Sequence, residues 1–382
     1  MAANKKVAIF IVSLFGGGAE RVVSILLKYL PAHLDIHLVL LHNTIEYEIP
    51  AGQKVHLLSK STSSNPILNI LKIPLLAWRY KRFLKKNDIH TSFSFLPRPN
   101  FIALFTRLWG YRDRIIISER QYTSYHYKQN TLAAKTGGLL VKWLYPKADT
   151  IVCNSQAIVA DLQRNFGVQS QFAVVHNPVD LALIDKHWTT APGPGTVFTF
   201  ITIGRLSHEK NHALILKACA LLPATGYRVQ IVGKGPLQEE LLANIHALTL
   251  QDRVSLEPHT HNPFAMMGGA HCFILSSDTE GFPNALLEAM ACGLPVIATD
   301  CKAGPSDLLR PGAEASESVD TLTKCPYGIL VPPGNEKILA QAMQLMMEDA
   351  ALRHQYAQKS KERSNDFAVE RIVKAFTTLL EQ

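Results

Sequence analysis

Short apolar segments alternate with helix-patterned segments along almost the whole chain, and this alternation constrains the fold more than any other feature. Strand-length segments separated by helices are typical of βαβ units, which build parallel sheets. In the first half of the chain the apolar segments are residues 7–13, 36–41, 91–95, 115–118, 150–153 and 172–175. In the second half they are residues 198–203, 229–232, 254–256, 272–275, 296–298 and 328–331. The pattern predicts an α/β protein made of doubly wound, Rossmann-like parallel sheets.

The alternation breaks once, between residues 180 and 195, where Trp188 is followed by a stretch rich in proline and glycine. A chain of 382 residues is long enough for two or three domains. We therefore expect an N-terminal domain at 1–184 and a C-terminal domain at 196–365. Residues 366–382 form a last helix that is a candidate to pack back on the first domain. Ligands of such sheets bind at the carboxyl ends of the strands, so we expect a site in a cleft between the domains.

The net charge of +8 is unevenly divided along the chain. Residues 1–180 hold 22 basic and 10 acidic side chains, a net +12, and the remainder holds 17 and 21, a net −4. A basic half indicates an acidic partner such as a nucleic acid, an anionic membrane or a phosphorylated substrate. No RNA-binding or helix-turn-helix signature accompanies the charge, so we expect no nucleic acid.

The first residues fit either a signal peptide or a buried first strand, because Lys5 and Lys6 precede an apolar run. The strand is favoured because an apolar-periodic helix follows without a break. The chain has no run of 18 apolar residues, and its six cysteines show no CxxC spacing. These features predict a cytoplasmic protein with reduced thiols.

Two short motifs are weak on their own. Gly16, Gly17 and Gly18 lie between the first strand and its helix, where a backbone can approach a phosphate, but the spacing is not GxGxxG. His208 to His212 match HExxH, the pattern of zinc hydrolases. Both histidines would then have to lie inside one helix, whereas we place the motif in a loop and a helix start.

Arg205 and Lys210 follow the strand at 198–203, at the edge where a ligand would bind. Two fixed cations suit a diphosphate that gains negative charge as it leaves. A pair of solvated surface charges explains them equally well from composition alone.

The segment at 276–290 is the most informative in the chain. It follows the strand at 272–275, and a helix is predicted to begin near Asn284 with free N–H groups. Glu280 is expected at the strand end and Glu288 one turn inside the helix, so both carboxylates can face one ligand.

Glu280 to Glu288 resembles the E-x7-E motif of retaining glycosyltransferases of the GT-B fold, in particular glycosyltransferase family 4. The resemblance extends to residues 17–21, 118–120, 175–180, 204–206, 209–211, 232–236, 281–284, 293–297 and 328–334. It is greatest to the group that adds hexose or N-acetylhexosamine to bacterial lipid-linked oligosaccharides, lipopolysaccharide and surface polysaccharides.

The resemblance implies roles for individual residues. Arg205 and Lys210 would hold the diphosphate of a UDP-sugar, Glu280 would contact its sugar, and Glu288 its ribose. The residues that would form the rest of the donor site are Gly17, Gly18, Gly204, Gly233, Gly281, Phe282, Pro283 and Asn284. The catalytic candidates are Arg205, Lys210, Glu280 and Glu119. The family needs no metal, and the sequence contains no Asp-x-Asp motif.

Two positions depart from the family pattern. Many relatives have a histidine near the anomeric carbon where this chain has Glu119, which leaves the catalytic group there open. Pro258 replaces a glycine of many relatives, which puts recognition of the base in doubt.

The segment at 66–86 combines apolar residues and Trp78 with the cations Arg79, Lys81, Arg82, Lys85 and Lys86. Such a stretch suits either an anionic membrane surface or a core-packed helix with a solvated basic face. We also assign Arg120 to the acceptor or membrane surface.

The sequence thus predicts a retaining glycosyltransferase that takes a UDP-sugar to a lipid-linked glycan acceptor. We expect it at the inner face of the cytoplasmic membrane as a peripheral protein. A sugar-nucleotide epimerase or a phosphorylase of the same fold is the alternative. From other classes, a nucleic-acid-binding module and a zinc hydrolase at His208 and His212 remain possible.

Overall fold

The computed structural model describes residues 5–59, 65–188, 197–260, 262–313 and 317–382, and the chain divides into two compact units. Unit 1 comprises Met1–Pro178 and Val369–Gln382, and unit 2 comprises Val179–Ala368. The first unit therefore ends before residue 184, the boundary expected from the sequence. The proline- and glycine-rich part of the linker, residues 191–195, lies outside the described residues.

Unit 1 is built on a seven-stranded sheet in the order β3-β2-β1-β4-β5-β6-β7. All six strand pairs are parallel; in the register of β1, Val7 lies opposite Ile36 on one side and Thr91 on the other. The strands are β1 (Lys5–Ile11), β2 (Leu34–Leu40), β3 (Lys54–Leu57), β4 (Thr91–Phe95), β5 (Arg114–Glu119), β6 (Thr150–Cys153) and β7 (Phe172–Val174). The segment that resembled a signal peptide is thus an interior strand of this sheet, between β2 and β4.

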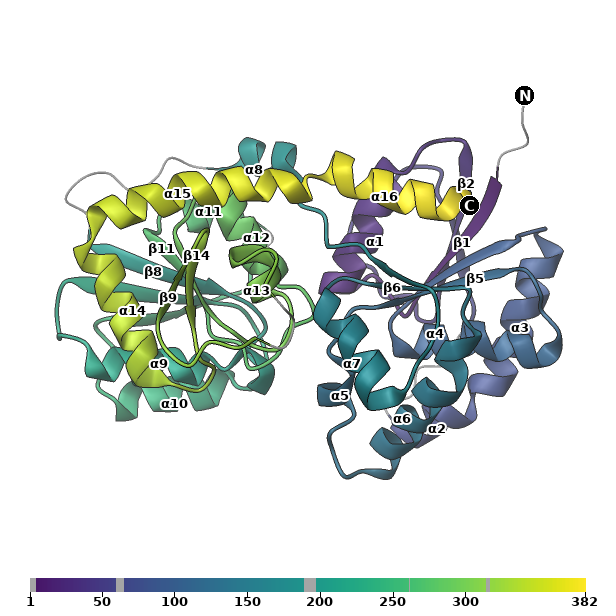
Figure 1. The fold of residues 1–382 in the computed structure, drawn as a ribbon, viewed down its shortest axis with the longest axis horizontal. Coiled ribbons are helices and arrows are strands. Elements are labelled where there is room, and N and C mark those ends of the chain that lie inside the picture. The colour runs from purple at the N-terminus through teal and green to yellow at the C-terminus, as the bar shows by residue number, and fades with distance from the viewer. Residues whose placement is uncertain (1–4, 60–64, 189–196, 261, 314–316) are drawn as a thin grey trace. The chain divides into compact units, whose positions relative to one another are not determined.

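Helices cover both faces of the unit 1 sheet (Figure 1). Val7, Ile9 and Ile11 pack in one core with α1 (Gly18–Tyr29) and α16 (Val369–Glu381), whereas Phe10 points to the other face and contacts Tyr80 of α3 (Ile73–Lys86). This alternation is the two-residue period of a strand buried on both sides. The other helices are α2 (Pro66–Leu71), α4 (Pro97–Phe105), η1 (Thr106–Trp109), α5 (Thr123–His126), α6 (Leu132–Leu144), η2 (Tyr145–Lys147) and α7 (Gln156–Phe166).

Unit 2 repeats the architecture with the strand order β10-β9-β8-β11-β12-β14-β13. Every pair is parallel except the edge strand β13, which runs antiparallel to β14. The strands are β8 (Phe198–Ile203), β9 (Tyr227–Val232), β10 (Val254–Glu257), β11 (Cys272–Leu275), β12 (Val296–Thr299), β13 (Thr323–Cys325) and β14 (Gly328–Val331).

The helices of unit 2 bury their apolar sides against the two faces of this sheet. They are α8 (Leu181–His187), η3 (His208–Lys210), α9 (His212–Leu221), α10 (Gln238–Ala247), α11 (Pro263–Gly268), α12 (Asn284–Ala291), α13 (Pro305–Leu309), α14 (Glu336–Glu348), α15 (Ala350–Ser364) and η4 (Asn365–Phe367). Helix α8 belongs to unit 2 because Ile184 packs in its core, which explains the shift of the boundary from 184.

The predicted fold class is confirmed: two doubly wound, mainly parallel sheets make an α/β protein. All six cysteines are buried and free. Within the described ranges, no helix combines the length and the apolar character needed to cross a bilayer.

Candidate functional site

The polar residues predicted to act are concentrated where β8 and β11 end. These strands are neighbours in the unit 2 sheet, with Phe273 paired to Ile201, so the loops that follow them emerge side by side. The first loop leads from Gly204 to η3, and the second leads from Ser276 to the start of α12. Loops at the carboxyl ends of parallel strands are the usual binding region of such sheets.

An ion pair joins the two loops. The Nζ atom of Lys210 lies 2.5 Å from Oε1 of Glu280, and the Ser277 hydroxyl donates to the same oxygen at 2.7 Å. The side chain of Lys210 is 26% exposed and that of Glu280 is 9% exposed, so the pair is shielded but reachable from solvent. The structure therefore brings together two predicted catalytic residues that are 70 positions apart.

Further hydrogen bonds fix this pair in place. The Asn211 amide donates to Oδ1 of Asp278 at 2.9 Å, and the Ser276 hydroxyl donates to the Lys210 carbonyl at 2.9 Å. The backbone N–H of Asp278 donates to the carbonyl of Glu209, also at 2.9 Å. Polar groups held in advance by such bonds need little reorganisation when charge develops on a ligand.

Two glycines allow neighbouring loops to pack beneath the site. A Cβ atom on Gly233 would lie 1.9 Å from the carbonyl oxygen of Gly204, and one on Gly235 would lie 2.3 Å from that of Leu206. Gly233, which the sequence placed in the donor site, thus has a steric reason for being glycine that requires no ligand.

The turn before α12 mixes surface and core residues. Phe282 is 5% exposed and packs against Phe367 with ring centroids 5.5 Å apart, so its side chain is part of the unit 2 core. This excludes Phe282 as a side-chain ligand and leaves only its backbone for binding. Pro283 caps α12, whose first residue is Asn284, and Glu288 follows in the helix with 8% exposure.

The backbone of this turn is also supported from another loop. Gly304 adopts a φ of 91° and lies so close to Gly281, Phe282 and Pro283 that a Cβ would meet Pro283 Cδ at 2.5 Å. A residue other than glycine would therefore displace the turn. Arg205 is exposed at the head of the first loop, and no hydrogen bond or ion pair of its side chain is present in the described part of the chain.

In unit 1, Gly17 is the N-cap of α1 and Gly18 its first residue. The carboxylate of Glu20 folds over Gly17, where a Cβ would come within 2.1 Å of it. Burial raises the pKa of Glu20 above its usual value. A ligand can therefore approach the N-terminus of α1 at Gly17 only if the Glu20 side chain moves away.

Glu119 is the last residue of β5 and lies inside unit 1. It is 1% exposed; Tyr145 donates to Oε2 at 2.6 Å, and the backbone N–H of Arg120 donates to Oε1 at 3.0 Å. Burial raises its pKa to about 7, and these hydrogen bonds partly oppose that rise. Through these hydrogen bonds the buried Glu119 carboxylate holds the start of the loop after β5 in place.

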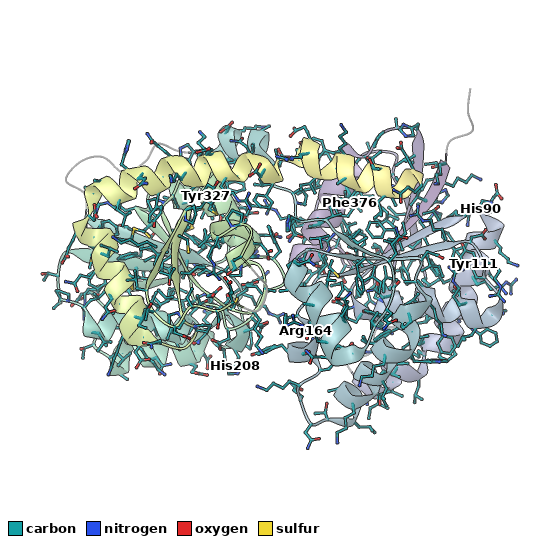
Figure 2. The ribbon with its side chains drawn as sticks, viewed as in Figure 1. His90, Tyr111, Arg164, His208, Tyr327 and Phe376 are labelled. Atoms are coloured by element: carbon teal, nitrogen blue, oxygen red, sulfur yellow. The ribbon has the colours of Figure 1, made fainter. Side chains whose placement is uncertain are left out.

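Arg120 is also buried, so its assignment to an acceptor or membrane surface is wrong. It is 6% exposed, donates to Ser118 Oγ at 2.8 Å and to Asn177 Oδ1 at 2.7 Å, and lies over the rings of Phe95 and Phe376 at 5.4 and 5.5 Å. Phe376 is labelled on α16 in Figure 2. Burial lowers the pKa of Arg120 to about 10, so it remains charged at neutral pH.

The HExxH match does not have the geometry of a zinc-protease helix. His208 lies in η3 and is exposed (Figure 2), whereas His212 begins α9 and is 3% exposed. Asn211 separates them with a left-handed φ of 44°. Burial lowers the pKa of His212 to about 4. Within the described ranges, no group of three His, Cys, Asp or Glu residues is placed to hold a metal ion.

Sequence reasoning missed the residues that support the site, namely Ser277, Asn211, Asp278 and Gly304. A hydroxyl and a carboxylate directly after β11 were visible in the sequence, but Asp278 accepts from Asn211, 67 positions earlier, and the Ser277 hydroxyl donates to Glu280. Nothing in the sequence signalled the contact of Gly304 with the turn.

Two Rossmann-like units, with a polar site at the carboxyl edge of the second sheet, define a GT-B protein. Solved structures agree on this fold. Sucrose-phosphate synthase from Thermosynechococcus elongatus superposes with a TM-score of 0.80 at 18% identity, covering 99% of this chain and 98% of that one. HepE of Anabaena, solved in complex with UDP, superposes with a TM-score of 0.76 at 18% identity, covering 98% and 99%.

Family models match both halves of the chain. Glycosyltransferase Family 4 matches residues 16–183, and Glycosyl transferases group 1 matches residues 191–363. A Campylobacter jejuni protein, N-acetylgalactosamine-N,N'-diacetylbacillosaminyl-diphospho-undecaprenol 4-alpha-N-acetylgalactosaminyltransferase, is 37% identical over 95% of this chain and 96% of its own length. A second C. jejuni protein, an alpha-1,4-N-acetyl-D-galactosaminyltransferase acting on a diphospho-undecaprenol-linked glycan, is 24% identical over 98% of each chain. The chain belongs to glycosyltransferase family 4 and is a glycosyltransferase.

Proposed function

We propose that the protein is a retaining glycosyltransferase that moves a hexose or an N-acetylhexosamine from a UDP-sugar to a lipid-linked oligosaccharide or polysaccharide precursor. The observation that carries this proposal is the Lys210–Glu280 pair, which is held by hydrogen bonds at the carboxyl edge of the unit 2 sheet. The two C. jejuni relatives support the acceptor class, because their names describe transfer to glycans on diphospho-undecaprenol. Their alpha linkages support retention, because UDP-hexoses are themselves alpha-linked at the anomeric carbon.

The reaction breaks the bond between the anomeric carbon and the diphosphate oxygen and forms a bond from that carbon to an acceptor hydroxyl. The bond's electron pair leaves with the UDP, and the acceptor's proton goes to an oxygen of the leaving phosphate. Lys210 and Arg205 supply positive charge where negative charge grows on the diphosphate. Glu280 is placed to orient both the Lys210 ammonium group and a sugar hydroxyl, and Glu288 to accept the ribose hydroxyls.

Loop backbone groups complete the proposed donor site. Gly281 and Asn284 offer N–H groups at the start of α12, where the helix dipole favours an anion. Gly17 and Gly18 offer the same at the start of α1, and Gly204 keeps the loop beside Lys210 free of a side chain. The proposed mechanism assigns charge stabilisation to the two cations and needs no metal ion.

The donor is tested by screening UDP-sugars and other sugar nucleotides for protection of the purified protein against thermal unfolding. A ligand that binds only the folded protein raises the Tm by an amount that grows with the logarithm of its concentration relative to its Kd. We expect UDP-hexoses or UDP-N-acetylhexosamines to raise the Tm equally with and without EDTA. Interconversion of a UDP-sugar without an acceptor would instead indicate an epimerase.

We further propose that unit 1 docks on the inner face of the cytoplasmic membrane. Its α3 buries Ile73, Leu76 and Tyr80 on one side and exposes Arg79, Arg82, Lys85 and Lys86 on the other; Lys81 is partly exposed. A core-packed side and a basic side thus coexist on this helix, and the basic side supports the proposed membrane contact.

Exposed apolar residues extend this surface beyond α3. Helix α2 contacts α3 and α6, and η1 contacts α3, so these four helices are neighbours; α2, α3 and α6 lie on the same side of the unit 1 sheet in Figure 1. We call their exposed surface the docking face; its large apolar residues are Ile67, Leu68, Leu71, Leu75, Trp78, Leu108, Trp109, Leu132, Leu139 and Trp143.

Cations accompany the three tryptophans of the docking face. The Arg82 guanidinium lies 4.7 Å from the centre of the Trp78 ring, and the Lys147 ammonium lies 5.6 Å from that of Trp143. The Lys81 ammonium donates to the carbonyl of Trp109. Tryptophan next to lysine and arginine suits the boundary between acyl chains and anionic headgroups. This combination supports a membrane over a second protein, whose interfaces are depleted in lysine.

A further inference from the structure

A group of cationic side chains at the carboxyl edge of the unit 1 sheet is not used by the proposed mechanism. His42 follows β2, Arg98 lies in the first turn of α4 directly after β4, and Lys72 ends α2. Strands β2 and β4 flank β1, which leads into the glycine loop at 16–18. The group therefore lies at the ligand-binding edge of this sheet.

The three side chains are close enough to act on one another. Nη1 of Arg98 lies 3.4 Å from Nε2 of His42. Burial lowers the pKa of His42 below its usual value, and the charges of Arg98 and Lys72 lower it further. None of the groups that influence the pKa of His42 or Arg98 is a carboxylate. Like charge held beside a partly buried group is a costly arrangement.

Two N–H donors of the group also lack acceptors. Nε of Arg98 and Nδ1 of His42 are buried, and neither has a hydrogen-bond partner in the described part of the chain. Nε2 of His42 is the atom that faces Arg98, so the proton of the neutral ring belongs on Nδ1. Buried donors without acceptors destabilise a fold and call for an explanation such as an unoccupied ligand site.

The backbone beside Arg98 is strained as well. Leu96, the residue that caps α4, has φ 74° and ψ 154°, a region that residues with a Cβ rarely adopt. Strain of this kind is found mainly at ligand sites, where it fixes the position of a functional side chain. Pro97 and Pro99 leave few N–H groups in the first turn of α4, so the side chains rather than the helix terminus must hold a ligand.

We propose that His42, Arg98 and Lys72 form a diphosphate-binding site in unit 1. Arg98 can donate two N–H groups to phosphate oxygens, the Nδ1–H of His42 can donate a third, and Lys72 adds positive charge. Both His42 and Arg98 keep part of their surface exposed, so a ligand can reach them. Under the proposed function, two substrates carry this chemistry: the acceptor, as a lipid diphosphate, and the donor, as a UDP-sugar.

The test is calorimetric titration of the full-length protein and its Arg98→Met variant with two probes. One arm titrates UDP, and the other titrates farnesyl diphosphate in the presence of saturating UDP. Arg164→Met, which removes an exposed arginine of α7 labelled in Figure 2, is the matched control. We expect Arg98→Met to weaken one probe at least about tenfold and the control to weaken neither.

The arm that weakens identifies the source: farnesyl diphosphate indicates the acceptor, and UDP indicates the donor. Unchanged affinity for both probes would overturn the proposal. Both arms measure binding alone, so failure of glycosyl transfer with every donor would refute the proposed function without touching this result.

The Tm without ligand separates binding from a merely structural role. Because Arg98 holds a buried donor without an acceptor, Arg98→Met should keep or raise the Tm of the ligand-free protein while it weakens the diphosphate. A lower Tm together with weaker binding would show that Arg98 supports the fold instead. His42→Phe, which removes the second such donor, should give the same two changes and guards against misfolding of one variant.

Discussion

The two units share the same central strand order but use their polar and apolar side chains in opposite ways. Unit 2 places its charged predicted residues in loops at the sheet edge, where Lys210 and Glu280 pair within reach of solvent. Unit 1 buries the corresponding charged residues, since Glu119 and Arg120 are 1% and 6% exposed. One fold thus supports a reactive edge in one unit and an internal polar anchor in the other.

The exposed apolar side chains have the opposite distribution, because most of them lie in unit 1. Among the described residues, sixteen large apolar side chains of unit 1 are exposed, whereas in unit 2 only Val197, Leu221 and Leu242 are. Ten of the sixteen form the docking face, and cations lie beside its three tryptophans. Under the proposed function, the basic half of the chain interacts through helix surfaces and the acidic half through loops.

The largest effect is expected at the edge of unit 2. Lys210→Ala should lower kcat for glycosyl transfer by about 10²–10³, because it removes a fixed charge from the leaving diphosphate. Steady-state kinetics with the donor found in the Tm screen would measure this. Lys217→Ala, on the exposed side of α9, is the matched control and should keep its activity. If Lys210→Ala and Lys217→Ala were equally active, the loops at the edge of unit 2 would not be the site of transfer that distinguishes this unit from unit 1.

The buried Glu119 carboxyl of unit 1 should change how the free energy of unfolding depends on pH. The pKa of Glu119 rises on folding from 4.5 to about 7, so in this window the folded protein holds a proton that the unfolded chain lacks. Its contribution is therefore unfavourable and grows as the pH rises from about 4.5 to 7, by up to about 3 kcal/mol of unfolding free energy.

Glu119→Gln removes this titration, so urea unfolding between pH 5 and pH 8 should show a smaller decline than in the wild type. Glu362→Gln, at an exposed position of α15, should leave the decline unchanged. An identical decline in wild type and Glu119→Gln would mean that Glu119 is ionised in the fold, as a catalytic carboxylate would be.

Substitutions in the docking face should have a smaller effect and weaken binding to vesicles by about tenfold. The triple variant Trp78→Ser, Trp109→Ser, Trp143→Ser should sediment less with vesicles that contain phosphatidylglycerol. The double variant Leu221→Ser, Leu242→Ser alters exposed apolar residues of unit 2 and should sediment as the wild type does.

Tryptophan fluorescence can locate the contact independently. The chain has four tryptophans, and Trp188→Phe leaves only the three of the docking face. Brominated lipids should quench the fluorescence of this variant, and added salt should weaken the quenching. If the Leu221→Ser, Leu242→Ser variant lost vesicle binding to the same extent, the docking face would bind membranes no better than the rest of the surface.

The sequence predicted the sheets well because most strands are continuous apolar segments buried on both faces. Thr91–Phe95 and Cys272–Leu275 have the predicted bounds. The two missed strands lie at sheet edges: β3 is largely exposed and β13 has three residues, so neither shows an apolar run. Edge strands carry a weaker pattern because one side lacks a neighbour.

The site was predictable only in part. The positions of Lys210 and Glu280 followed from the strands they succeed, since neighbouring parallel strands end at one edge. The burial of Glu119 and Arg120 did not follow, because it depends on Tyr145 and Phe376, which come from other segments of the chain. A motif identifies residue types, whereas the direction of a side chain is decided by its tertiary neighbours.

The central claim is that the donor diphosphate binds at the Lys210–Glu280 edge of unit 2, apart from the docking face of unit 1. Calorimetric titration with UDP tests it most directly, on the wild type, on Lys210→Ala and on the triple tryptophan variant. We expect at least about tenfold weaker UDP binding to Lys210→Ala and unchanged binding to the tryptophan variant. Wild-type affinity in Lys210→Ala would contradict it.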